Sequence, residues 1–172
     1  MSAEPNRLRI LAALLSMPEG DALDVLRDML SEAPWLAAAL PELEQIPLDR
    51  WQAEHTRLFV NGYPKTPCPP FESAYRQGQM GGTTVGDLEG LYRRAGLAAT
   101  EASADYLGTL LECTAYLQDR ESMGDLLEEL REEHLARWVP RFAQDLQEHA
   151  RLRLYRLVGE RLAARFPGGD HD

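Results

Sequence analysis

The segment EHTRLFVNGYPKTPCPPFESAY, residues 54–75, determines how this chain is organised. Four prolines lie within residues 64–70. Proline has no backbone N–H and a fixed φ, so this stretch is neither a helix interior nor a central strand. The residues around its start have the spacing of one helix face, which carries Leu48, Trp51, His55, Leu58 and Phe59. The segment therefore predicts a helix, then a stiff extended loop, then a short helix over residues 71–75.

Apolar residues with helical spacing continue outward from this segment in both directions. These apolar stripes cover residues 8–15, 22–29, 85–95, 107–117, 123–138, 142–150 and 154–162. Gly96 and Pro140 are expected to end the helices that precede them. No alternating pattern typical of a strand stands apart from the stripes. The sequence predicts an all-α fold, with one compact helical domain over residues 1–166 and a disordered tail over residues 167–172.

Size and charge limit the classes of partner. A chain of 172 residues is long enough to bury one hydrophobic core. Its net charge of −10 opposes binding to nucleic acid, and suits either plain solubility or a basic partner. Apolar runs such as residues 10–15 are too short to span a bilayer, and the N-terminus lacks a secretory signal pattern. We expect a cytoplasmic protein whose two cysteines are free thiols.

Motifs for the common catalytic chemistries are missing from the sequence. It has no Glu-x-x-His, His-Glu-x-x-His, phosphate-binding glycine loop or Gly-x-Ser-x-Gly. His134 lies on an apolar helix face, which favours a hydrogen-bonded core histidine over a ligand or an acid–base group. Cys68 has no activating neighbour in the sequence, which favours an inert thiol. We expect no catalysis, no metal and no cofactor.

The acidic residues after position 127 have two interpretations. Glu128, Glu129, Glu132 and Glu133 have the spacing of one helix face. Such a face could attract an arginine-rich ligand, but a solvated helix surface is the simpler interpretation. We expect the solvated surface.

Aromatic residues flank the proline-rich loop on both sides. Rings presented from a rigid backbone form a concave apolar surface at little cost in conformational entropy. The alternative is that Phe59 and Phe71 only anchor the loop to the core. The rings concerned are those of His55, Phe59, Tyr63, Phe71 and Tyr75.

Five short motifs occur in order between residues 54 and 142. They are EHTRLF (54–59), PPFESAY (69–75), LYRRAGL (91–97), DYL with LLE (105–107 and 110–112) and HLARWVPRF (134–142). In this order they resemble the TorD/DmsD/NarJ group of redox-enzyme maturation chaperones. The family's leader-binding members have Glu-Pro-x-Asp-His where this chain has Ala102 to Tyr106, with only Asp105 in common. This difference, and the histidine at position 55 in place of the first aromatic residue of the Leu-Phe motif, make the chain more similar to the NarJ-like branch. The client tails of that branch can lack a leader.

The resemblance implies the fold and the function. It implies an all-helical chaperone that binds the apo catalytic subunit of a molybdopterin-dependent oxidoreductase, often at an N-terminal twin-arginine leader. The chaperone would hold this subunit until cofactor is inserted and delay its export until then. Members occur as monomers or domain-swapped dimers, for which the proline-rich loop and Gly81-Gly82 would be hinges.

The peptide-binding site expected from the resemblance combines an apolar groove with carboxylates. Glu72 and Asp105 would pair with the leader's arginines as charge-assisted hydrogen bonds. Two alternatives remain: a general peptide-binding scaffold for another client, and a helical enzyme with an unrecognised site. The complete set of expected site residues is His55, Phe59, Tyr63, Pro70, Phe71, Glu72, Ser73, Tyr75, Asp105 and Tyr106.

Overall fold

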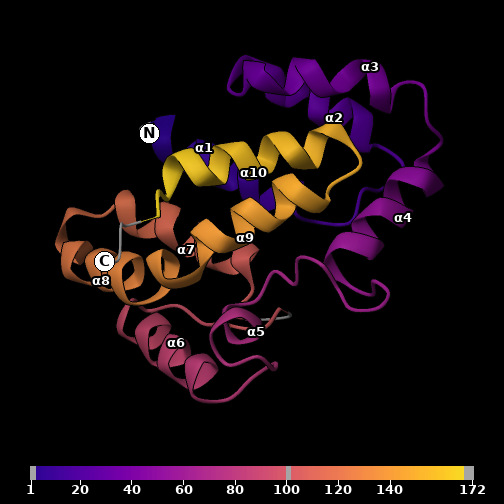
Figure 1. The fold of residues 1–172 in the computed structure, drawn as a ribbon. Coiled ribbons are helices and arrows are strands. Elements are labelled where there is room, and N and C mark those ends of the chain that lie inside the picture. Colours follow the sequence, from indigo (N-terminus) through magenta and orange to yellow (C-terminus); the bar gives the residue numbers. More distant parts are fainter. Residues whose placement is uncertain (1–2, 100–101, 169–172) are drawn as a thin grey trace.

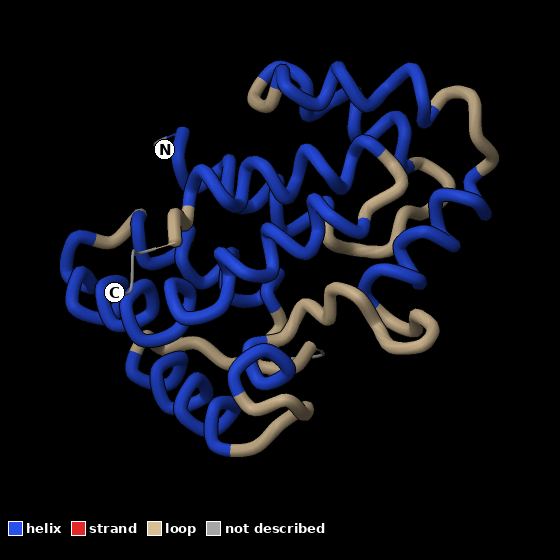
Figure 2. The backbone as a smooth tube through the Cα atoms, in the orientation of Figure 1, coloured by secondary structure: helices blue, strands red, loops and turns tan. Residues whose placement is uncertain are grey.

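The computed structural model describes residues 3–99 and 102–168, where the backbone forms helices and loops but no strand (Figure 2). The predicted all-α fold is confirmed. The α-helices are α1 (Ala3–Leu14), α2 (Ala22–Asp28), α3 (Leu40–Leu43), α4 (Leu48–Phe59), α5 (Glu72–Arg76), α6 (Thr83–Arg94), α7 (Leu107–Gln118), α8 (Gly124–Glu129), α9 (Ala136–His149) and α10 (Arg153–Arg165). The 3-10 turns are η1 (Met29–Ser31), η2 (Pro34–Ala39) and η3 (Glu121–Met123), and η4 (Leu130–Leu135) is a π-helical turn.

Within the described ranges, every helix falls short of the length and continuous apolarity that a transmembrane span requires. Residues 169–172 of the predicted tail lie outside the described part of the chain. The tail and the domain boundary at residue 166 therefore stay predictions.

The centre of the fold is formed by α9 and α10, which run side by side across the molecule (Figure 1). α1 packs against α7, and η2 packs against α10. The helices α9 and α10 approach closely at Gly159, where a Cβ atom would lie 2.9 Å from the carbonyl oxygen of Ala143. A glycine is needed there because any side chain would push the two backbones apart.

The expectation that Pro140 ends a helix is wrong. Pro140 lies inside α9, and the helical path continues from α8 through η4 into α9. In η4 the amide of Ala136 donates to the carbonyl of Arg131, five residues back. This wider turn shifts the hydrogen-bond register just before Pro140. The helix therefore tolerates the missing N–H of the proline and the space that its ring takes up. The stop predicted at Gly96 is confirmed, because Gly96 follows α6 with φ of 75°.

A buried carboxylate fixes α4 to the start of α10. Glu54 Oε2 accepts the backbone amides of Arg151 and Leu152 at 2.5 and 3.1 Å. Trp51 Nε1 donates to the hydroxyl of Tyr155 at 3.1 Å. These bonds satisfy otherwise orphaned amides before α10 and fix the face of α4 that carries His55 and Phe59.

A second buried carboxylate joins the proline-rich loop to the segment before α7. Asp105 Oδ2 accepts from the backbone amide and the hydroxyl of Ser73 at 2.9 and 2.5 Å, and Oδ1 accepts from the hydroxyl of Ser103 at 2.6 Å. The Leu107 amide donates to the Pro70 carbonyl at 2.9 Å, and the Glu72 amide donates to the Asp105 carbonyl at 3.2 Å. An isolated antiparallel bridge pairs residues 71 and 106 between these bonds. We call this set of bonds the Asp105 clamp.

Replacing Gly159 should destabilise the protein. We expect Gly159→Ala to lower the free energy of unfolding by about 1–3 kcal/mol, because the methyl group collides with the α9 backbone. Gly86→Ala is the matched control, since its Cβ would meet nothing within 4 Å in the exposed middle of α6. That control should gain about 0.5–1 kcal/mol from helix propensity. Chemical denaturation measures both, and a neutral Gly159→Ala would contradict the close approach of α9 and α10.

The Asp105 clamp should also contribute measurably to stability. We expect Asp105→Ala to lower the free energy of unfolding by about 2–3 kcal/mol, because the buried Ser73 amide loses its acceptor. The exposed residue Asp87 on α6 provides the control, and Asp87→Ala should change stability by less than about 0.5 kcal/mol. Equal denaturation midpoints for the two variants would show that the clamp does not hold the loop.

Candidate functional site

An apolar groove lies where the proline-rich loop meets the C-terminal end of α4. Its volume is about 350 Å³. The lining residues are Leu15, His55, Phe59, Val60, Thr66, Pro69, Pro70, Phe71, Met80 and Tyr106. Five of the ten predicted site residues are among them: His55, Phe59, Pro70, Phe71 and Tyr106.

Each wall of the groove is positioned by local geometry. His55 and Phe59 lie one turn apart on α4, with ring centroids 5.0 Å apart at an interplanar angle of 65°. The amide of Cys68 donates to the carbonyl of Leu58 at 2.9 Å, which turns the loop back against α4. Across the groove, the rings of Phe71 and Tyr106 lie 5.7 Å apart on the two segments joined by the Asp105 clamp.

The rim of the groove exposes apolar side chains to solvent. Val60 is 61% exposed and Met80 is 56% exposed, and both line the groove. These two residues were not predicted as site residues from the sequence, and neither were Leu15, Thr66 and Pro69. Leu15 follows α1, about forty positions before His55, so its place in the groove depends on tertiary packing alone. Val60, Thr66 and Pro69 lie within the segment first singled out, where a loop gives no periodicity to show which residues face inward.

Two predicted site residues lie away from the groove. The side chain of Tyr63 is 99% exposed and is not among the lining residues. The ring of Tyr75 packs against Trp138 and Phe142, with centroid distances of 5.4 and 6.0 Å. Its hydroxyl donates to Asp145 at 2.8 Å, and burial together with this carboxylate raises the pKa of Tyr75. Tyr75 therefore anchors α5 to α9.

The two carboxylates expected at the rim are buried instead. Glu72 is fully buried and lies 3.0 Å from His134 Nδ1 and 2.6 Å from Arg76 Nη1. Asp105 is also fully buried, and its oxygens are occupied by the clamp, in which Ser73 is a donor. Neither carboxylate faces solvent, so the expectation that these two residues pair with the arginines of a leader peptide is wrong. Charge alone does not reveal burial in a sequence.

Two interpretations of single residues are confirmed. His134 is a buried, hydrogen-bonded core histidine, and its partner is Glu72. The thiol of Cys68 is fully buried, and burial together with the nearby Asp145 raises its pKa to about 12. A thiol with this pKa is protonated at neutral pH and is a poor nucleophile.

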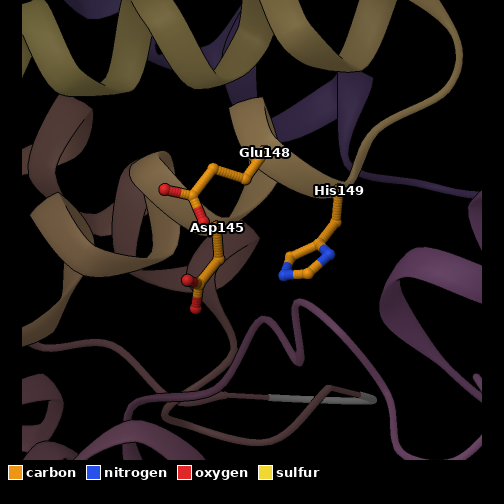
Figure 3. Close-up of side chains that lie close together, drawn as sticks. All are labelled: Asp145, Glu148 and His149. Atoms are coloured by element: carbon orange, nitrogen blue, oxygen red, sulfur yellow. The ribbon is translucent and has the colours of Figure 1, made fainter.

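Two carboxylates on α9, those of Asp145 and Glu148, are accessible to solvent. Asp145, Glu148 and His149 lie close together (Figure 3), and one possible ligand atom of each lies within 4.8 Å of those of the other two. Asp145 is half-buried and holds the Tyr75 hydroxyl, whereas Glu148 and His149 are exposed. Such groups are common on protein surfaces without a metal, so the absence of a metal site stays a prediction.

The chain is similar to proteins of known family. The sequence profile of the nitrate reductase delta subunit family matches residues 19–144. The chaperone protein YcdY of Escherichia coli (strain K12) is 27% identical over 108 residues, which is 62% of this chain and 55% of that protein. The chain thus matches about half the length of this relative.

A solved structure has the same fold. It is the crystal structure of a candidate redox enzyme maturation protein from Archaeoglobus fulgidus, which is 20% identical in sequence. The superposition covers 96% of this chain and 94% of that one with a TM-score of 0.67. The family profile spans most of the chain, including α4, the proline-rich loop and the segment before α7, and it confirms the resemblance carried by the five motifs. This chain belongs to the nitrate reductase delta subunit family.

Proposed function

We propose that this chain is a cytoplasmic chaperone for the maturation of a redox enzyme, and that it is not itself an enzyme. Its client would be the apo catalytic subunit of a molybdopterin-dependent oxidoreductase. The observation that carries the proposal is the apolar groove with its exposed rim of Val60 and Met80. Family membership and the likeness to a chaperone and to a candidate maturation protein support it.

The groove suits a peptide segment more than a small polar substrate. Its walls are mostly aromatic rings and prolines, and burying their exposed surface gains about 25 cal/mol per Å². The proline-rich backbone is already stiff, so binding costs little ordering of the loop. An N-terminal segment of the client, with or without a twin-arginine leader, is the proposed occupant. Holding it would keep the subunit from export until its cofactor is inserted.

Arginines in such a leader would meet carboxylates outside the groove. Glu148 on α9 is exposed, and the net charge of −10 favours the approach of a basic segment. Glu72 and Asp105 would act indirectly in this proposal, because they fix the walls of the groove. The proposed oligomeric state is a monomer or a domain-swapped dimer, with Gly81 and Gly82 as the hinge between α5 and α6; both have positive φ.

Peptide binding should depend on the groove. We expect calorimetric titration with N-terminal peptides of a molybdoenzyme catalytic subunit from the same organism to show binding that a scrambled peptide lacks. Phe71→Ala should weaken this binding at least about tenfold, roughly 1.4 kcal/mol, because one wall is removed. Val60→Ser tests the rim without touching the core and should weaken binding by a smaller factor.

The matched control for these variants is an aromatic residue outside the groove. Tyr116 is partly buried on α7, and Tyr116→Ala should leave peptide affinity unchanged. Circular dichroism would establish that each variant is folded. Absence of binding to every peptide from the client's N-terminus, or equal loss in Phe71→Ala and Tyr116→Ala, would contradict the proposed groove.

Leader arginines should contribute a salt-dependent part of the affinity. We expect Glu148→Gln to weaken binding of a leader peptide about two- to threefold at low ionic strength, because one exposed ion pair is lost. The difference should disappear at high salt. Glu160→Gln on the exposed face of α10 is the control and should have no effect. A leader whose arginines are replaced by glutamine should bind both proteins equally, and a persistent difference would contradict the pairing.

A further inference from the structure

A second pocket lies where α1 and η2 meet the last turns of α10, and it shares no lining residue with the groove. Its volume is about 400 Å³, a size typical of pockets that bind ligands. Part of its wall is apolar and includes the buried side chains of Leu8 and Leu11 and the half-buried ring of Trp35. This wall suits the apolar part of a ligand.

Three arginines line the same pocket, which we call the arginine pocket: Arg7, Arg161 and Arg165. Arg165 forms an ion pair with Glu4. Arg7 and Arg161 are exposed, and neither has a carboxylate partner within residues 3–99 and 102–168. The guanidinium group of Arg161 lies over the ring of Trp35, 5.2 Å from its centroid. Stacking uses the face of a guanidinium group and leaves the N–H donors at its edge for a ligand.

Positive charge continues behind Arg165. In the orientation that satisfies its amide, Gln118 accepts through its side-chain oxygen from Nη2 of Arg165 at 2.9 Å and from Nη2 of Arg131 at 2.6 Å. Burial and the charge of Arg165 lower the pKa of Arg131. The pocket lining has three arginines against two carboxylates, Glu4 and Glu32, in a protein whose net charge is −10. An anion in the pocket would relieve the repulsion among these arginines.

We infer that the arginine pocket binds an acidic segment of the client polypeptide, in which an aspartate or glutamate lies next to a bulky apolar residue. The inference rests on the proposed function. The carboxylate of this segment accepts from the guanidinium groups of Arg7 and Arg161, a pairing that is strong because both partners are charged. The apolar side chain beside it packs against Trp35. Charge complementarity selects this occupant, since the pocket is a positive region on an acidic protein and repels a basic segment.

The test uses short peptides that tile the catalytic subunit of a molybdoenzyme from the same organism, with binding followed by tryptophan fluorescence. Trp51 and Trp138 are buried, so Trp35 is the tryptophan that a bound peptide reaches. An acidic peptide in the pocket should change the emission, and Trp35→Phe should lose this change. Replacing the acidic residue of the peptide by its amide should weaken binding about three- to fivefold at low ionic strength. High salt should reduce the difference.

Variants of the arginines decide whether the carboxylate is held by this pocket. Arg7→Gln and Arg161→Gln should each weaken binding of the acidic peptide about three- to fivefold. Each variant should also be less sensitive than the wild-type protein to replacement of the acidic residue by its amide. Both arginines are exposed, so these variants should fold. Arg153→Gln removes the same charge from an exposed position on α10 outside the pocket, and it is the matched control.

The outcomes separate this inference from the proposed function. Equal affinity of the acidic peptide for wild-type protein, Arg7→Gln and Arg161→Gln would overturn the inference, as would an equal loss in Arg153→Gln. Binding of N-terminal client peptides to the groove would then leave the chaperone function standing. If no peptide of the client binds, both fail.

Other occupants of the pocket would also overturn the inference. Free glutamate that binds as tightly as the peptide would identify the ligand as a small anion. A change in the emission of Trp35 that depends on protein concentration without peptide would mean that a second copy of the chain fills the pocket.

Discussion

The carboxylate of Asp105 holds together two stretches of chain that are separate in sequence and that lie side by side where they line the groove. Its oxygens accept from Ser73 and Ser103, so the start of α5 and the segment before α7 cannot move independently. Backbone bonds on either side of the bridge between residues 71 and 106 complete the connection. A buried charge is tolerated here because each oxygen has a donor. The rings of Phe71 and Tyr106 take their positions from this contact.

The remaining walls of the groove depend on a similar use of buried charge. Glu54 accepts amides before α10 and so fixes α4, the helix that presents His55 and Phe59. Glu72 lies between His134 and Arg76 and ties α5 to the helical path of η4. The three carboxylates of Asp105, Glu54 and Glu72 are therefore already hydrogen-bonded within the fold. What the groove offers an occupant is shape and apolar surface, which suits recognition of a polypeptide better than acid–base chemistry.

The helices could be predicted from the sequence because their burial is periodic. The stripes over residues 107–117 and 154–162 correspond to α7 and α10, whose buried faces they form. Pro140 could not be interpreted correctly, since the π-helical turn that accommodates it depends on packing and leaves no local pattern. The loop was predictable from its prolines, yet only half of the expected site residues line the groove. Glu72 and Asp105 were misplaced because a sequence shows charge, whereas burial is decided by partners such as His134 and Ser73 that are distant in sequence.

Residues in the family motifs serve the fold and the groove together, and the structure separates the two roles. Within PPFESAY, Pro69, Pro70 and Phe71 line the groove, whereas Glu72, Ser73 and Tyr75 bond inward to His134, Asp105 and Asp145. This motif therefore largely serves to hold two prolines and one aromatic ring in place. If the groove binds a client segment as proposed, its specificity comes from residues that line the groove without anchoring it. On this chain those are the rim residues Val60 and Met80, since a substitution there changes what the groove accepts without releasing the loop.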